Sequence, residues 1–178
     1  MGDVKIEVKN VTKIFGKSPR NGIEMLNSGM TKKEILAKTG MTVGVNRANF
    51  KIYAGEIFVI MGLSGSGKST LVRMLNRLIE PTDGNVYIDE QDIVKLNANE
   101  LREVRRRKMS MVFQQFALFP HRTVLSNVMY GLEIRGFDKN EQKERALEAL
   151  KQVGLEGYEN SFPKELSGGM QQRVGLAR

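Results

Sequence analysis

The chain contains, at residues 62–69, the stretch Gly62-Leu63-Ser64-Gly65-Ser66-Gly67-Lys68-Ser69, which fits the pattern G-x-x-x-x-G-K-[ST]. The residues before it, Glu56–Met61, form a short apolar run that is typical of a buried strand, and Ser69–Asn76 after it has the pattern of a helix. A strand, a glycine-rich turn and a helix are the context that a phosphate-binding loop requires. The sequence therefore predicts such a loop in a protein of the α/β class.

Each part of this loop has an expected physical role. Gly65 and Gly67 allow the backbone to curl so that successive N–H groups point inward, and the helix N-terminus adds a partial positive charge. Lys68 would reach the β- and γ-phosphates of a nucleotide, and the Ser69 hydroxyl would ligate Mg²⁺. The alternative is a connecting turn without a ligand. The residues expected to bind nucleotide are Gly62, Leu63, Ser64, Gly65, Ser66, Gly67, Lys68, Ser69 and Thr70.

Composition excludes several classes of protein. The chain has 178 residues, the length of one ordinary domain. It has no cysteine and a single histidine, His121, which excludes disulfides, thiolate metal sites and a histidine cluster for zinc. No apolar run approaches the roughly 18 residues that span a bilayer, and the first residues lack the apolar core of a signal peptide. We therefore expect a cytosolic protein, or one held at a membrane through its partners.

The chain is basic, with a formal net charge of +8. Its densest basic cluster consists of Arg102, Arg105, Arg106, Arg107 and Lys108. Such a cluster can contact a phosphate backbone, but no aromatic residue lies among these residues, as stacking on single-stranded nucleic acid would require. We interpret the cluster as the solvated face of a helix.

The rest of the chain alternates between strand and helix patterns, as in an α/β fold. Strands are expected at Lys5–Val11, Val43–Tyr53, Val86–Ile88 and Met109–Phe113, and helices at residues 98–107, 123–134 and 139–153.

An unusual segment lies between the first two expected strands. Thr31 and Glu34 form a capping box that opens a helix through Lys38, and Gly40 would end it. The segment superficially resembles a helix-turn-helix, which would make the chain a DNA-binding regulator. The second helix would have to include Val43-Gly44-Val45, which favours a strand instead. We therefore predict a helical insertion at about residues 16–42.

A second motif, Leu166-Ser167-Gly168-Gly169-Met170-Gln171-Gln172-Arg173, resembles the signature of ABC-type ATPases, and Val112-Phe113-Gln114 resembles the start of their Q-loop. The similarity is closer still to the ATP-binding subunits of glycine betaine/proline (quaternary amine) importers. The stretches that carry it are Val11–Gly16, Thr31–Leu36 and Ala117–His121. The resemblance implies a P-loop NTPase fold with a RecA-like mixed sheet core and a helical subdomain. Residues 1–115 would form the core, and residues 116–178 the Q-loop and helical subdomain.

The resemblance also implies roles for further residues. In a head-to-tail dimer, the signature of one copy would face the ATP held by the other; its residues are Ser167, Gly168, Gly169, Met170 and Gln171. Gln114 would orient water or complete the Mg²⁺ shell. Phe15 would stack on adenine, although a phenylalanine of the core is an open alternative.

The implied partners are a second copy of the subunit, transmembrane permease subunits and, indirectly, a substrate-binding protein. Residues 116–131 would receive the permease, with Phe119-Pro120 as the anchor. The implied location is the cytoplasmic face of the cell membrane, and no nucleic acid is expected.

The sequence departs from the family pattern after the signature. The family continues with a strand ending in Asp, a catalytic Glu and a switch histidine, whereas no acidic residue follows Gly168 here. We therefore expect a partial cassette that binds ATP and lacks the hydrolytic residues. Asp89-Glu90 also replaces the usual Asp-Gly of a hairpin turn. The remaining alternatives are an ABC-type ATPase for another substrate, a DNA-associated ABC-type ATPase and the DNA-binding regulator.

Overall fold

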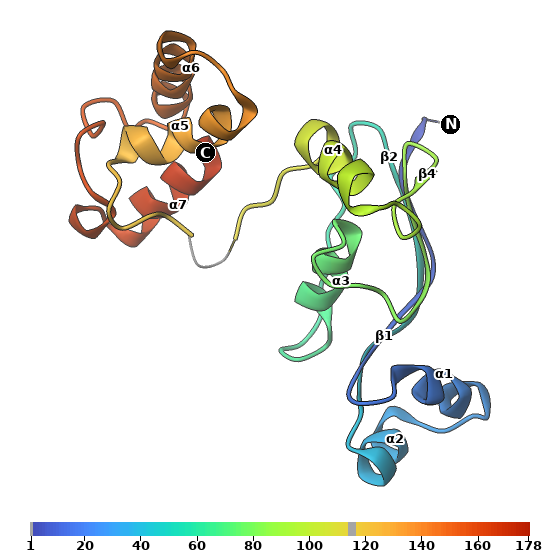
Figure 1. Ribbon diagram of the computed structural model, residues 1–178. Helices are drawn as coiled ribbons and strands as arrows, with labels where there is room; N and C mark the ends of the chain where they lie inside the picture. Colours follow the sequence, from blue (N-terminus) through green and yellow to red (C-terminus); the bar gives the residue numbers. More distant parts are fainter. Residues whose placement is uncertain (1, 114–116) are drawn as a thin grey trace. The chain divides into compact units, whose positions relative to one another are not determined.

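The computed structural model describes residues 2–113 and 117–178. The chain divides into two compact units, Met1–Met109 and Ser110–Arg178. The first unit contains the strands and the glycine-rich loop, and the second is helical (Figure 1).

The first unit is built on a four-stranded antiparallel sheet in the order β2-β1-β3-β4. The predictions of strands at Lys5–Val11, Val43–Tyr53 and Val86–Ile88 are confirmed. At one end of the long β1–β2 pair, Phe15 lies opposite Thr42, and at the other Val4 lies opposite Tyr53. The strands are β1 (Val4–Phe15), β2 (Thr42–Tyr53), β3 (Asp83–Ile88) and β4 (Gln91–Asp92).

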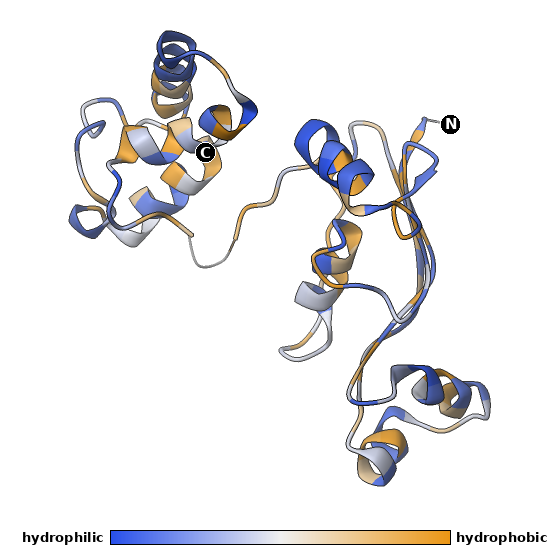
Figure 2. Cartoon of the chain, viewed as in Figure 1, coloured by the Kyte–Doolittle hydropathy of each residue, from blue (hydrophilic) through white to orange (hydrophobic). Residues whose placement is uncertain are grey.

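Two helices complete the core of this unit: α3 (Lys68–Leu75), which follows the glycine-rich loop, and α4 (Ala98–Lys108). Apolar residues of the sheet pack with Met74 of α3 and with Leu101 and Val104 of α4. In Figure 2, α4 has one hydrophobic and one strongly hydrophilic side, as expected for a helix that covers a core. The helix thus presents most of its arginines to solvent.

The segment expected as a helical insertion contains two helices. These are α1 (Pro19–Asn27) and α2 (Lys32–Thr39), which form a small core of their own with Ile14, Met41 and Val43. The Thr31–Glu34 capping box opens α2, and Gly40 closes it in the left-handed conformation. Because β2 begins at Thr42, the second helix that a helix-turn-helix needs is not formed, and the structure contradicts that alternative.

Two predicted strands are wrong. Neither Glu56–Met61 nor Met109–Phe113 forms a strand, and the first is strongly exposed, with Ile57 91% and Met61 85% accessible. An apolar run becomes a buried strand only if neighbours pair with its N–H and C=O groups on both sides. The four described strands pair antiparallel with one another, and none of them pairs with either segment. The described residues therefore form the antiparallel part of the expected mixed sheet.

The second unit consists of α5 (Val124–Arg135), α6 (Lys139–Gln152), the short 3-10 helix η1 (Pro163–Glu165) and α7 (Gly168–Ala177). The predictions of helices at residues 123–134 and 139–153 are confirmed. Val124, Leu150 and Val174, one residue from each long helix, are completely buried in a common core. No helix among the described residues is long and apolar enough to cross a membrane.

Candidate nucleotide-binding site

The glycine-rich loop has the backbone conformation that its sequence requires. Gly65 and Gly67 have φ angles of 75° and 95°, in the left-handed region that favours glycine. Helix α3 starts directly after Gly67, with no side chain capping its N-terminus. The first N–H groups of a helix have no acceptor within the helix, so those of α3 are available to an anion at the loop.

Lys68 reaches back across this loop. Its Nζ donates to the carbonyl oxygens of Gly62 and Leu63, both at 2.8 Å. These two bonds place the ammonium group against the start of the loop, close to the first turn of α3. The positive charge and the helix N-terminus therefore act on the same small region. Ser69, the next residue of α3, is exposed.

One residue of β2, Gly44, lies near both the Phe15 ring and the glycine-rich loop. A β-carbon at Gly44 would lie 2.9 Å from Cε2 of Phe15, so the ring lies over Gly44. The carbonyl oxygen of Gly44 occupies the place that a β-carbon on Gly67 would need. The ring is 41% exposed, which argues against the alternative of a core phenylalanine. Gly44 thus lies near both the Phe15 ring and Gly67 of the glycine-rich loop.

The signature residues open helix α7 in the second unit. Ser167 is the N-cap, and its Oγ accepts from the Met170 N–H at 3.3 Å. β-carbons on Gly168 and Gly169 would meet nothing within 4 Å, so this helix start is open to an approaching group. Gln171 behaves differently from the expected ligand: its Nε2 donates to the carbonyl oxygens of Pro163 and Leu166, at 3.0 and 3.1 Å. Gln171 thus braces the segment that leads into the helix.

The other end of α7 contacts the segment after the expected Q-loop. Arg178 donates from Nη1 to the Ala117 carbonyl oxygen at 2.5 Å. Its guanidinium lies 4.6 Å from the ring centroid of Phe119 and 5.1 Å from that of Tyr130, and these two rings meet edge to face. Burial lowers the pKa of Arg178. The signature helix therefore connects an open N-terminus with the segment that includes Phe119.

The Phe119 segment is held by charged and polar neighbours. Arg122 forms an ion pair with Glu133 at 2.7 Å, and this bond raises the pKa of Arg122 and lowers that of Glu133. Asn127, which is completely buried, bonds to the backbone of Phe119 and Arg122. Sequence reasoning missed Asn127; the available signal was a polar residue in the apolar stretch at the start of α5.

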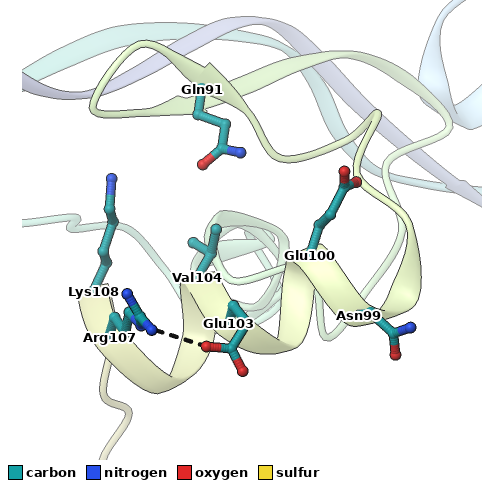
Figure 3. Close-up of a pocket in the computed structure, with 7 residues that line it drawn as sticks. All are labelled: Gln91, Asn99, Glu100, Glu103, Val104, Arg107 and Lys108. Atoms are coloured by element: carbon teal, nitrogen blue, oxygen red, sulfur yellow. Dashed lines mark ion pairs between the residues drawn. The ribbon is translucent and has the colours of Figure 1, made fainter.

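Gln114 falls outside the described residues. A surface hollow of about 500 Å³ lies between β4 and α4 (Figure 3). Its charged groups already have partners, since Glu103 pairs with Arg107 and Lys108 pairs with Asp89. The residues that line it are Gln91, Asn99, Glu100, Glu103, Val104, Arg107 and Lys108.

A known family accounts for the presence of both glycine motifs. The sequence model of the ABC transporter family matches residues 45–178. The chain belongs to the ABC transporter family. The expected P-loop NTPase fold of the ABC type is thereby confirmed.

Individual members of the ABC transporter family are similar over almost the whole chain. Over 175 residues, the chain is 67% identical to the glycine betaine transport ATP-binding protein OpuAA of Bacillus subtilis, covering 98% of this chain and 42% of that protein. It is 59% identical to the glycine betaine/proline betaine transport system ATP-binding protein ProV of Escherichia coli, with 98% and 44% covered. The chain thus spans less than half the length of these curated relatives.

A solved ABC cassette has the same fold. The structure is described as a dimeric post-hydrolysis state of an ATP-binding cassette bound to ADP and Pi. It matches with a TM-score of 0.78 and 38% identity, covering 97% of this chain and 67% of that chain.

Proposed function

We propose that this chain binds ATP at the glycine-rich loop and acts as the nucleotide-binding part of an ABC importer. The observation that carries the proposal is the position of Lys68, whose Nζ is fixed on Gly62 and Leu63 beside the uncapped start of α3. The loop fits a triphosphate because its first helical N–H groups and its lysine favour negative charge at one place. Phe15, on the sheet side of the loop, would take the adenine.

A magnesium ion fits the same site. Mg²⁺ is commonly bound through one or two protein oxygens together with substrate phosphates, and the exposed Ser69 hydroxyl in the first turn of α3 is such an oxygen. The ion would supply charge neutralisation at the phosphates. Gln114 is proposed as the second protein oxygen. Lys68 and Gln114 are the residues of this chain that we propose to act on the reacting groups.

The signature end of α7 would bind the γ-phosphate of an ATP held by a second copy. The open backbone at Gly168 and Gly169 and the cap at Ser167 support this, since a phosphate could approach the first N–H groups closely. Met170 packs against the helical core, so only its backbone would face a ligand. The dimeric state of the solved cassette supports the same arrangement. The division into a core, residues 1–115, and a helical part, residues 116–178, belongs to this proposal.

The substrate of transport is proposed from the relatives. OpuAA is named for glycine betaine transport and ProV for glycine betaine/proline betaine transport. We therefore propose that this chain energises uptake of glycine betaine, proline or a related quaternary amine. Its partners would be permease subunits at the cytoplasmic face of the membrane and, through them, a substrate-binding protein. The segment around Phe119, in which Ala117, Pro120 and His121 are exposed, is the proposed permease contact.

Lys68→Ala tests the proposal directly. Isothermal titration of Mg·ATP into the purified chain should show about a 100-fold weaker affinity, since loss of a charged hydrogen-bond partner costs roughly 2–3 kcal/mol. The matched control is Lys95→Ala, which removes an exposed lysine that pairs loosely with Asp92 at 3.6 Å. Equal affinities for the Lys68→Ala variant and the unchanged chain would refute nucleotide binding at this loop.

Transport is tested in the cells that carry the gene. Replacing Lys68 by Ala at the chromosomal locus should abolish uptake of labelled glycine betaine, whereas labelled methionine uptake should stay unchanged. If the Lys68→Ala change abolishes neither glycine betaine uptake nor methionine uptake, the nucleotide site serves another transport substrate.

A further inference from the structure

Gly44 occupies a position where a side chain would collide with a single group. A β-carbon there would lie 2.9 Å from Cε2 and 3.5 Å from Cδ2 of Phe15, and its next neighbour, the Lys13 carbonyl oxygen, is at an ordinary 3.7 Å. Among non-bonded contacts, 2.9 Å is well inside the usual carbon–carbon separation. Gly44 does not have a left-handed backbone, so a residue with a side chain could adopt its conformation without strain. The glycine is therefore needed for space above β2, not for backbone freedom.

The Phe15 ring fills that space. Phe15 and Gly44 are on the adjacent strands β1 and β2, and the ring lies over the bare backbone at Gly44. Lys13, two residues earlier on β1, places its Nζ 5.2 Å from the ring centroid and donates to the Glu80 carbonyl oxygen at 2.8 Å. The ring is thus bounded by Gly44 and by a fixed ammonium group, yet 41% of Phe15 remains accessible.

We propose that Gly44 is a positioning residue for the nucleotide base: by leaving β2 bare, it sets the Phe15 ring low against the sheet and so fixes the plane on which the base would stack. The inference rests on the proposed binding of ATP at that loop. Base stacking on an aromatic ring needs a defined ring plane, and it contributes on the order of 10-fold or more to affinity. Gly44 therefore determines how much the base increases the affinity for ATP beyond that of the phosphates alone.

The phosphate loop should be insensitive to a methyl group at position 44. Gly67 approaches the carbonyl oxygen of Gly44, and an alanine keeps that carbonyl in place. The added methyl would instead force the Phe15 ring to turn about its side-chain bonds. Gly44→Ala thus separates the base part of the site from its phosphate part.

The test compares two ligands that share the phosphates and differ in the base. Isothermal titration measures the affinities of Mg·ATP and Mg·tripolyphosphate for the unchanged chain, Gly44→Ala, Phe15→Ala and the double variant. We expect Gly44→Ala to weaken ATP about 5–10-fold and to leave tripolyphosphate within 2-fold, close to the effect of Phe15→Ala. In the Phe15→Ala background, Gly44→Ala should have no further effect, because residues that act through one contact are not additive. Gly2→Ala is the control, since its β-carbon would meet Tyr53 at an ordinary 3.8 Å.

Other outcomes overturn the inference in distinguishable ways. Equal weakening of both ligands would show that Gly44 acts on the phosphate loop, and additive losses in the double variant would show that it acts independently of Phe15. If the Phe15→Ala variant binds ATP as tightly as the unchanged chain, the base does not stack on Phe15. If neither ligand responds to Lys68→Ala, the proposed function fails first. Gly44→Ser, which adds a similar volume, should repeat the result of Gly44→Ala.

Discussion

Asn127 holds Phe119 by both ends of one amide group: its Oδ1 accepts from the Phe119 N–H at 2.8 Å, and its Nδ2 donates to the Phe119 carbonyl oxygen at 3.2 Å. The same Nδ2 also approaches the carbonyl oxygens of Arg122 and Thr123, each at 3.0 Å. The side chain is completely buried, so no water competes for these groups. One residue of α5 thereby fixes the conformation of the whole segment from Phe119 to Thr123.

We expect Asn127→Ala to destabilise the helical unit by about 2–4 kcal/mol, because it leaves several buried backbone groups without a partner. Hydrogen exchange should show the loss at the Phe119 N–H and in α5. Asn140→Ala, at an exposed position in the first turn of α6, is the matched control and should stay within about 0.5 kcal/mol. A similar effect of both changes would mean that the Asn127 amide contributes no more than a surface residue.

Ser167 should be replaceable by Gly but not by Ala. Its Oγ accepts from the Met170 N–H, which is the bond of a helix N-cap. An N-cap Ser→Ala change costs about 1 kcal/mol, whereas Ser→Gly costs only a few tenths, because glycine leaves the N–H groups open to water. Hydrogen exchange in the first turns of α7 measures both. If Gly proves as costly as Ala, the cap interpretation of Ser167 is wrong.

The Asp89 carboxylate should make stability depend on pH in the acid range. Lys108 bonds to it at 2.9 Å and Lys5 at 3.0 Å, and these bonds, that of Lys108 first, lower its pKa from the ordinary value of 3.8. A depressed pKa in the folded state means that the stabilisation is complete above the ordinary pKa and is lost as the pH falls through the folded value. Asp89→Asn should therefore lower the urea midpoint at pH 7, and the difference from the unchanged chain should shrink below about pH 4.

Asparagine suits this test because Asp89 has a left-handed backbone, with φ at 45°, which asparagine tolerates. Asp3→Asn is the control, since the Asp3 carboxylate has no ion pair among residues 2–113 and 117–178. A difference between Asp89→Asn and the unchanged chain that is the same at pH 7 and pH 3 would contradict the assignment to this carboxylate.

Replacement of Glu90 by glycine should stabilise the protein. It follows Asp89 in the β3–β4 turn and has a φ of 65°, a conformation that costs a residue with a side chain roughly 1 kcal/mol relative to glycine. Glu90→Gly should raise the free energy of unfolding by about that amount, measured by urea titration. Gln91→Gly, one residue later in β4, should lower it, because glycine weakens a strand.

The sequence predicted what depends on neighbouring residues and missed what depends on distant ones. The Thr31–Glu34 capping box and the turns at Gly65 and Gly67 were correct because each is a property of a few consecutive residues. The strand at Glu56–Met61 was wrong because a strand needs partners elsewhere in the chain, which an apolar pattern does not specify. The Phe15–Gly44 contact joins positions 29 residues apart, and its only signal was a glycine inside a strand pattern.

The basic cluster of α4 shows the same limit. The sequence analysis placed Arg105 on a solvated helix face, and the structure does not. Its Nε donates to the Asn76 carbonyl oxygen at 2.9 Å and its Nη2 to the Arg77 carbonyl oxygen at 2.8 Å. These carbonyls follow the last turn of α3, where backbone oxygens lack partners within the helix. Arg105 thus ties the helix of the glycine-rich loop to α4.

We expect Arg105→Ala to destabilise the first unit by about 2–3 kcal/mol, since it removes two bonds from a charged donor to half-buried carbonyls. Arg105→Lys should recover only part of this, because an ammonium group does not reproduce the two parallel donors of a guanidinium. Arg107→Ala is the matched control: that side chain is 78% exposed and, within the described part of the chain, forms an ion pair only with Glu103 at 3.4 Å. Surface pairs of this kind contribute little. Urea unfolding measures the stability of all three variants, and hydrogen exchange in α3 locates the change. If Arg107→Ala loses as much stability as Arg105→Ala, the effect comes from the charge of the cluster and not from the cap on α3.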